Sequence, residues 1–342
     1  MKKMFFFAAI ASVAFASCTN DENIFEGVKN GREMTFVAAD YVHQTRAPHD
    51  LNQTFSNSNY QVWAWYTGDD QAHIDALVVD STNSFTTGYY WPDDSLDFAA
   101  ISPANDSCIA VSRASGATTV TYTFDNATKK NDHKTNLMHA DYVKQQLNAA
   151  KNNASVALGF RHALAKLIVN VHQNAGPTVT GVAGYEVVVK SLSFDDFYNE
   201  GKYVVTGNAQ NTQDKVWTPS GGTTDWSIIS TDQPIVSADF TTSTLDDYYV
   251  MPQNISDEAT VNITFNVITK LTTGGKSVKE VKTSKKIKDI CKTGSTTDKI
   301  ASWYTNKVIT YTFNINPVSE LKPITFTATE EEWGTTGGSH TF

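Results

Sequence analysis

The stretch LGFRHALAKLIVNVH, Leu158–His172, lies near the middle of the chain and decides its fold class. Its second half, Leu167–Val171, is rich in β-branched Ile and Val, which suit a strand whose two faces are at least partly covered. A helix is the rival over Phe160–Leu167, because Ala, Leu, Lys and Arg form helices well. The β-branched end and the stop at Asn174–Pro177 favour a buried strand between two β-rich halves.

Composition and spacing extend this interpretation to the whole chain. The 342 residues suffice for two domains, and 40% hydrophobic residues suffice to build their cores. Short runs rich in Thr, Val, Tyr and Phe recur between Pro, Gly and Asn, which predicts an all-β chain of two β-sandwiches in tandem. One or two short helices are expected, the best candidate being Asp141–Asn153. The clearest strand candidates are Tyr60–Tyr66, Leu96–Ile101, Thr118–Phe124, Tyr185–Phe194, Ala259–Lys270 and Lys307–Ile315.

The same signals predict where the parts divide. Residues 18–33 are polar and acidic, which is typical of a flexible tether. The N-terminal sandwich is expected over residues 34–176 and the C-terminal sandwich over residues 177–342, with Asn174–Gly184 as the hinge. The opening stretch is then the late core strand of the first sandwich.

The N-terminus predicts a signal peptide over residues 1–17. Met1–Lys3 is positively charged, and Met4–Phe15 is an apolar segment too short to span a bilayer comfortably. The small residues directly before Cys18 resemble the lipobox of bacterial lipoproteins. In that class the cysteine is acylated and becomes the first residue, so Cys18 is the predicted lipidation site. An ordinary secretory peptide with an incidental cysteine is the alternative.

The sequence contains no recognisable catalytic or cofactor-binding motif. A G-x-S-x-G nucleophile, a phosphate-binding loop, a G-x-G-x-x-G loop and an H-E-x-x-H metal pair are all missing. His139 and Asp141 share the spacing of one strand face, but two ligands do not make a metal site. His162 is expected to be a satisfied, partly buried histidine. We therefore predict no enzyme, no metal site and no cofactor.

Three further features have simple structural explanations. Four acidic doublets fall at turns, where solvation explains them more simply than paired catalytic carboxylates do. The lysines of Lys270–Lys292 predict a solvated hairpin and no nucleic-acid site, because no aromatic residue is interleaved with them. Cys108 and Cys291 are either two free thiols, which we prefer, or a bridge between the domains. The doublets are Asp69-Asp70, Asp93-Asp94, Asp195-Asp196 and Asp246-Asp247.

The strand Tyr60–Tyr66 carries two tryptophans at period two. Trp63 and Trp65 share one face, while Tyr60, Val62, Ala64 and Tyr66 share the other. An exposed Trp pair could stack on sugar rings, whereas a buried pair would belong to a sandwich core. We favour the core.

Taken in order, several stretches resemble the fimbrillin family, the FimA/Mfa-like subunits of type V pili. The most recognisable is Phe160–Lys166, FRHALAK. The resemblance covers nearly the whole mature chain and rests on the order of the pieces. The others are Phe36-Val37 with Thr45–Ala47, Tyr60–Tyr66, Trp91-Pro92 with Leu96–Phe98, Asn136–Ala140, Tyr248–Pro252 and Tyr311–Ile315.

The resemblance implies two transthyretin-like β-sandwich domains and export as a lipoprotein to the surface of the outer membrane. In polymerising subunits of this family an Arg-specific protease removes the N-terminal strand, and a strand of the neighbouring subunit refills the groove. Here the cut would fall between Arg46 and Ala47 and release residues 18–46. The implied partners are other fimbrial subunits, the outer membrane through the lipid, and a host or glycan ligand.

Two other functions stay open at this point. The tryptophans allow a surface glycan-binding lipoprotein without catalytic activity, in which Trp63 and Trp65 stack on sugar. The acidic doublets allow a hydrolase of unfamiliar fold. Among fimbrial roles, stalk, tip and anchor are all open, because the tail from Gly334 is Gly-rich and Ile324–Phe326 alternates only briefly.

Overall fold

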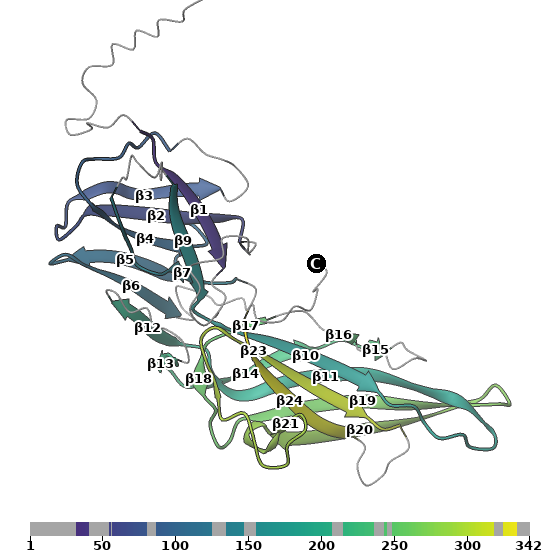
Figure 1. Cartoon of the computed structure of the whole chain (residues 1–342). Coiled ribbons are helices and arrows are strands. Elements are labelled where there is room, and N and C mark those ends of the chain that lie inside the picture. Colours follow the sequence, from purple (N-terminus) through teal and green to yellow (C-terminus); the bar gives the residue numbers. More distant parts are fainter. Residues whose placement is uncertain are drawn as a thin grey trace, which may run out of the picture.

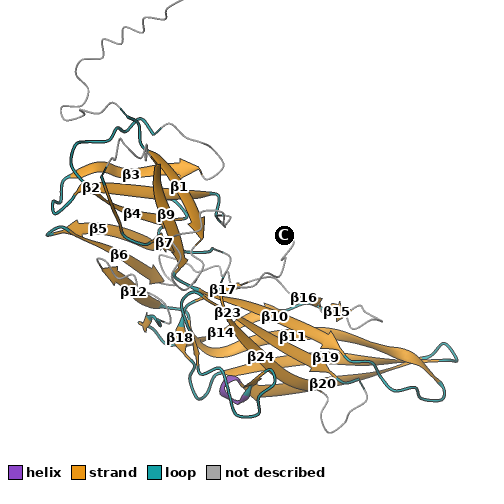
Figure 2. Ribbon diagram, in the orientation of Figure 1, coloured by secondary structure: helices purple, strands orange, loops and turns teal. Residues whose placement is uncertain are grey.

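The computed structural model shows an elongated, almost entirely β molecule of two bodies joined end to end (Figures 1 and 2). In the described part of the chain the helical element is one 3-10 turn, Ile287–Asp289. None of the helices there is long and apolar enough to cross a membrane. The structure describes residues 32–40, 55, 57–80, 87–124, 135–146, 155–206, 215–235, 243–244, 248–317 and 324–333.

The first body, here the first sandwich, packs a seven-stranded sheet against a four-stranded one. The larger sheet has the order β1-β9-β7-β4-β2-β3, with β8 paired to β4, and the smaller has the order β13-β12-β6-β5. The larger sheet consists of β1 Thr35–Asp40, β2 Asn59–Tyr66, β3 Ala72–Asp80, β4 Leu96–Ser102, β7 Met138–Ala140, β8 Val143–Gln145 and β9 Ser155–His162. The smaller sheet consists of β5 Ile109–Ala114, β6 Ala117–Phe124, β12 Gly201–Thr206 and β13 Thr218–Pro219.

The second body, here the second sandwich, has a six-stranded sheet of order β16-β10-β23-β24-β21, with β17 on β10. Facing it is a five-stranded sheet of order β14-β11-β19-β20, with β15 on β11. The first of these contains β10 Ala165–Gln173, β16 Ser243–Thr244, β17 Tyr248–Val250, β21 Cys291–Lys292, β23 Lys307–Ile315 and β24 Ile324–Glu332. The second contains β11 Val182–Tyr198, β14 Thr223–Ile229, β15 Gln233–Ile235, β19 Thr260–Leu271 and β20 Lys276–Lys286, and β18 Gln253–Asn254 pairs with β22 Ser302–Trp303.

The alternation expected from the sequence is confirmed in the cores. In β19 the side chains of Val261, Ile263, Phe265 and Val267 are buried on one face, and their neighbours in sequence are half-buried. The period of two thus places every second residue of β19 in the core of the second sandwich.

The prediction of one strand over Leu158–His172 is wrong. The stretch forms two strands, β9 and β10, and the chain changes sheets at Ala163-Leu164. Both residues are fully buried, and the Ala163 N–H donates to the Leu137 carbonyl while the Trp217 indole donates to the Ala163 carbonyl. Because β9 is buried in one core and β10 in the next, with no polar break between them, the pattern of the sequence is that of one buried strand. The chain therefore passes from the large sheet of the first sandwich to the second sandwich at this bend.

The helix predicted over Asp141–Asn153 is also wrong where the structure describes it. Val143–Gln145 form strand β8, which pairs antiparallel with Leu96–Phe98 of β4. Val143 packs against the core of the large sheet, so tertiary pairing overrides the local helical spacing. Residues 147–154 lie outside the described part of the chain.

The first sandwich is completed by strands from later in the chain. β12 pairs with β6 along six residues, and β13 pairs with β12. Trp217, just before β13, is buried with Tyr122, Phe124 and Tyr203 in the core between the two sheets. Two adjacent sandwiches therefore do not correspond to two separate lengths of sequence.

Candidate functional site

β1 lies at the rim of the large sheet. It pairs in parallel with β9, from Thr35 opposite Ser155 to Asp40 opposite Phe160, and no other described strand pairs with it. Its side chains still enter the core, since Ala39 is fully buried and the Phe36 ring meets Phe98 edge-on at 6.0 Å; Met34, directly before the strand, is also fully buried. β1 is thus packed but peripheral.

The start of β1 is anchored by a neighbouring loop. The Met34 N–H donates to the Tyr89 carbonyl at 2.8 Å, and the Trp91 N–H donates to the Arg32 carbonyl at 3.0 Å. The Glu33 carboxylate accepts a hydrogen bond from the Gly88 N–H at 2.7 Å. These contacts hold the strand at its first residues. The predicted lipidation residue Cys18 and the predicted cleavage pair Arg46 and Ala47 lie outside the described residues.

β24, the last described strand, lies close to the rim of its own sheet. It pairs along its whole length with β23, and on its other side β21 reaches only Thr327 and Ala328. Two of its side chains are buried, Ile324 and Ala328, and Phe326 is half-buried against Phe313. The Gly-rich tail from Gly334 lies outside the described residues.

A buried imidazole, His162, lies where the two sandwiches meet. Its Nδ1 lies 3.0 Å from Asn136 Oδ1 and its Nε2 lies 3.8 Å from Asp40 Oδ2 at the end of β1. The Trp333 ring, directly after β24, stacks on the imidazole with 3.5 Å between centroids and 7° between planes. Burial lowers the pKa of His162 well below its ordinary value, and the charges of Lys166 and His139 lower it further. The ring is therefore neutral at neutral pH. The sequence predicted a satisfied, partly buried histidine, whereas His162 is fully buried and only its Nδ1 has a hydrogen-bond partner.

His139 and Asp141 engage different partners. His139 Nδ1 lies 2.9 Å from the Tyr122 hydroxyl, whereas Asp141 accepts two hydrogen bonds from the Arg161 guanidinium at 2.5 and 2.8 Å. Burial lowers the pKa of His139 to about 3, and the Arg161 charge adds to the effect. Within the described ranges no cluster of three or more His, Cys, Asp or Glu side chains could hold a metal ion.

The lowered pKa of His139 predicts acid destabilisation. The unfolded chain takes up a proton on this residue near pH ~6.5, and the folded chain resists it until about pH 3, so stability is complete above ~6.5 and falls below it. We expect the free energy of unfolding to drop by about 2 kcal/mol between about pH 7.5 and about pH 5 because of this group. Urea titrations at the two pH values measure the drop. Buried His162 adds a drop of its own, so His139→Gln should reduce the total drop by about this amount and not abolish it. The matched variant His172→Gln on β10 should leave the total drop unchanged, and an unchanged drop in His139→Gln contradicts the prediction.

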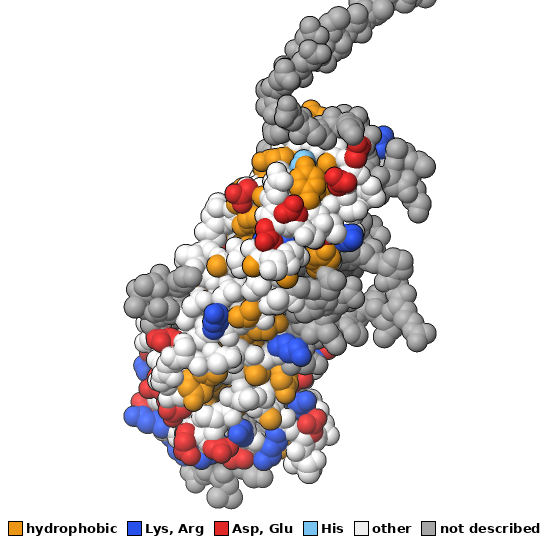
Figure 3. Space-filling view, turned by 90° about the vertical axis from the view of Figure 1, so that its left-hand side faces the viewer, with side chains coloured by type: hydrophobic (Ala, Val, Ile, Leu, Met, Phe, Trp, Pro, Cys, Tyr) orange, Lys and Arg blue, Asp and Glu red, His pale blue; other side chains and the backbone are white. Residues whose placement is uncertain are grey.

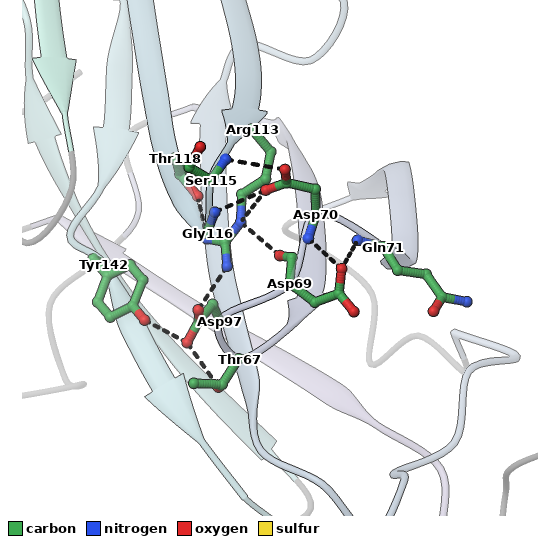
Figure 4. Close-up of polar contacts among 10 residues, drawn as sticks. All are labelled: Thr67, Asp69, Asp70, Gln71, Asp97, Arg113, Ser115, Gly116, Thr118 and Tyr142. Atoms are coloured by element: carbon green, nitrogen blue, oxygen red, sulfur yellow. Dashed lines mark hydrogen bonds and ion pairs between the residues drawn. The ribbon is translucent and has the colours of Figure 1, made fainter.

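A buried ion pair joins the two sheets of the first sandwich (Figure 4). Arg113 on β5 donates to Asp97 on β4 at 2.8 Å, and both side chains are 3% exposed. Tyr142 and Thr67 also donate to the Asp97 carboxylate. Burial alone would raise the pKa of Asp97, but the hydrogen bonds from Tyr142, Arg113 and Thr67 outweigh it and hold the pKa below its ordinary value. Sequence reasoning missed this cluster, although an Arg inside an alternating strand was a signal.

The acidic doublet Asp69-Asp70 belongs to the same region and works as a turn. Asp69 accepts from the backbone N–H groups of Asp70 and Gln71, and Asp70 accepts from those of Ser115 and Gly116 in the β5–β6 turn. The Asp70 carboxylate therefore ties two hairpin turns together across the sandwich (Figure 4). This arrangement fits the turn explanation better than a catalytic pair.

The two tryptophans of β2 lie on one strand face, as predicted. Trp65 is 5% exposed, and the Arg113 guanidinium covers its ring at 5.2 Å from the centroid. Trp63 is half-buried and packs against the core between the two sheets of the first sandwich. The pair does not form an open platform for a sugar.

Charged side chains are distributed unevenly over the two bodies. Acidic side chains gather over the upper body on the face shown in Figure 3, whereas both charge signs mix over the lower body. Several lysines of β20 and the turn after it are ion-paired, for example Lys282 with Glu280 and Lys288 with Asp257. Cys108 is buried and Cys291 is half-buried, and no disulfide joins them.

Comparison with known proteins identifies the family. The sequence pattern of the fimbrillin-like family, Mfa_like_1, matches residues 45–333. A fimbrial protein from Bacteroides vulgatus shares 15% identity and a TM-score of 0.54, covering 88% of this chain and 99% of its own. The fimbrial anchor protein Mfa2 from Porphyromonas gingivalis shares 13% identity and a TM-score of 0.34, covering 88% and 98%. No curated protein matches the sequence. Because the family pattern spans most of the residues, the chain belongs to the fimbrillin-like family.

Proposed function

We propose that this protein is a structural and adhesive subunit of a cell-surface fimbrium. It is exported as a lipoprotein through Cys18, cut between Arg46 and Ala47, and assembled by donor-strand addition with other fimbrial subunits. The observation that carries the proposal is the position of β1, which is packed into the first sandwich yet pairs with β9 alone among the described strands. A strand at the rim can leave without breaking a sheet in two.

Loss of β1 would create a groove of defined shape. The backbone groups of β9 that now pair with Thr35–Asp40 would be unpaired, and the sites of Met34 and Phe36 would be empty. An exposed strand edge beside apolar pockets is a template for an added strand, in which backbone hydrogen bonds give affinity and alternate side chains give register.

The sequence of β24 matches that of β1. Met34–Asp40 is M-T-F-V-A-A-D, and Ile324–Glu330 is I-T-F-T-A-T-E. Thr, Phe and Ala recur at the second, third and fifth positions, with an apolar residue at the start and an acid at the end. At the sixth position Thr329 of β24 would take the place of Ala39. β24, for which the sequence predicted only a brief alternation, is therefore similar in sequence to β1, the strand that it would replace.

β24 is also placed to leave its own sheet. It is the last described strand, β21 holds it on one side at two residues, and few of its side chains are buried. A strand paired fully on only one side peels at a lower cost than a strand paired fully on both sides. These features support a polymerising stalk subunit that gives β24 to its neighbour.

An Arg-specific protease tests the processing step. We expect the mature chain to be cut at Arg46 and to form ladders on a denaturing gel run without boiling, because added strands exchange slowly. Arg46→Ala should stay monomeric, and Arg32→Ala, which lies in the same released segment, should assemble normally. A mature chain that is cut at Arg46 and still stays monomeric contradicts the proposal.

The donor strand has its own test. In Phe326→Asp the donated strand would place a carboxylate in the apolar site that Phe36 leaves. Burial of an unpaired carboxylate costs several kcal/mol, so we expect the ladders to be at least ~100-fold weaker. Thr325→Asp is the matched control, since Thr325 is exposed on the opposite face of β24. Equal assembly of the two variants would exclude β24 as the donor.

The lipid anchor predicts a surface location on the outer membrane. Cys18→Ala should move the protein from the cell surface into the soluble fraction, because the acyl chains supply the membrane affinity. Retention of the variant at the membrane, measured by fractionation, counts against acylation at Cys18.

A further inference from the structure

The first and the last described strand both end at one buried side chain. Asp40 closes β1 beside His162 Nε2, and Trp333 follows β24 and stacks on the His162 ring. Trp333 is held on two further sides. Its ring lies parallel to Tyr249, at 5.7 Å and 2°, and its N–H donates to the Asn306 carbonyl at 3.0 Å. His162 therefore contacts the strand that is proposed to leave and the end of the strand that is proposed to be donated.

We propose that His162 is the positioning residue of strand exchange and couples the release of β24 to the departure of β1. The inference rests on the proposed function. Departure of β1 takes away Asp40 and opens the Nε2 side of the imidazole to water. The ring then loses its fixed plane, the stack with Trp333 loosens, and the end of β24 loses the contact that holds it at the first sandwich. Only a processed subunit offers its donor strand readily.

The surroundings of the ring support this role. Asn136 donates through its Nδ2 to the Met138 sulfur, which leaves its Oδ1 as the acceptor for His162 Nδ1–H. His162 Nε2 is then a buried acceptor without a hydrogen-bond partner, facing a carboxylate. The ring is thus fixed on the Nε2 side by packing and not by hydrogen bonding. A group held in this way responds to the loss of either neighbour.

A second path links the same elements through the backbone. The Asn306 N–H donates to the Leu164 carbonyl at 3.1 Å, and the Asn306 carbonyl accepts from Trp333. The bend at Ala163-Leu164, directly after His162, is therefore hydrogen-bonded to the residue that holds Trp333. The contacts from Asp40 to Trp333 form one contiguous chain, which can carry coupling between the two strands.

Hydrogen exchange of the mature chain tests the coupling in the monomer. We expect Asp40→Ala to speed exchange of the Trp333 N–H and of the end of β24 by about five- to tenfold. Trp333→Ala should speed exchange in β1 by a similar factor, because coupling between two sites is reciprocal. Both cross-effects should disappear in a His162→Gln background, which keeps an amide near Asn136. Asp75→Ala, exposed on β3, is the matched control and should change neither segment.

The outcomes separate this proposal from the proposed function. Unchanged exchange at Trp333 in Asp40→Ala, or cross-effects that persist in His162→Gln, overturns the role of His162. Asp40→Asn keeps the volume of the side chain and should reproduce the effect of Asp40→Ala only in part. Missing polymer ladders in a protein whose coupling is intact would instead overturn strand exchange, and the coupling would stand.

Discussion

Replacement of Arg113 by alanine is expected to lower the free energy of unfolding by about 3–5 kcal/mol. The Arg113–Asp97 pair is buried on both sides, so truncation leaves a carboxylate without its charged partner between two sheets. The Trp65 ring also loses the guanidinium that covers it. Urea denaturation followed by tryptophan fluorescence measures the loss.

Two controls define this prediction. Lys144→Ala, exposed on the neighbouring strand β8, should change stability by less than ~0.5 kcal/mol. Because the pKa of Asp97 is lowered in the folded protein, the stabilisation is present above the unfolded pKa of ~3.9 and is lost as pH falls below it. The cost of Arg113→Ala should therefore shrink in acid. A cost under ~1 kcal/mol at neutral pH would mean that the pair does not hold the sheets together.

Replacement of Trp217 by alanine is expected to cost about 3–5 kcal/mol as well. The indole is 2% exposed, lies parallel to Tyr203 and close to Phe124, and donates to the Ala163 carbonyl at 2.9 Å. It is the side chain through which the later part of the chain enters the first sandwich. Its loss should weaken that sandwich more than the second.

The measurement is chemical unfolding with a probe in each sandwich. We expect the two transitions, superimposed in the parent chain, to separate in Trp217→Ala. Trp217→Phe keeps most of the packing and removes the donor, so it should cost only about 1–2 kcal/mol. Thr218→Ala, exposed on β13, should leave both transitions unchanged. Loss of the second sandwich before the first would contradict the assignment of Trp217.

The sequence contained enough information for the strands and for the buried faces of the most regular ones. In β2 the side chains of Tyr60, Val62 and Ala64 enter one core, and Trp63 enters the other, as the period of two requires. Local alternation is a property of neighbouring residues, so it can be seen without knowing the partner strand. The family resemblance, built on the same strands in order, is confirmed.

Partner choice could not be predicted in the same way. Nothing in G-K-Y-V-V-T, residues 201–206, indicates that β12 pairs with β6, because a short strand does not encode which edge it joins. The bend at Ala163-Leu164 could not be predicted either. The residues before it, in it and after it are all buried, so the hydrophobic pattern does not change where the chain turns. The Arg113 cluster needs residues from β4, β5 and the β2–β3 turn, and only the folded chain brings these together.

The crossing of β12 and β13 into the first sandwich sets an order in time. A chain made at ~5–20 residues per second exposes its β5–β6 hairpin long before residues 201–219 exist to cover it. If the chain is exported as proposed above, the early half crosses the membrane first and stays there with one sheet unfinished. An unfinished sheet edge attracts other chains. We therefore expect exported chains to need a holding chaperone until Trp217 has crossed the membrane. The amount of chain bound to such a chaperone should fall sharply once the exported length passes Pro219.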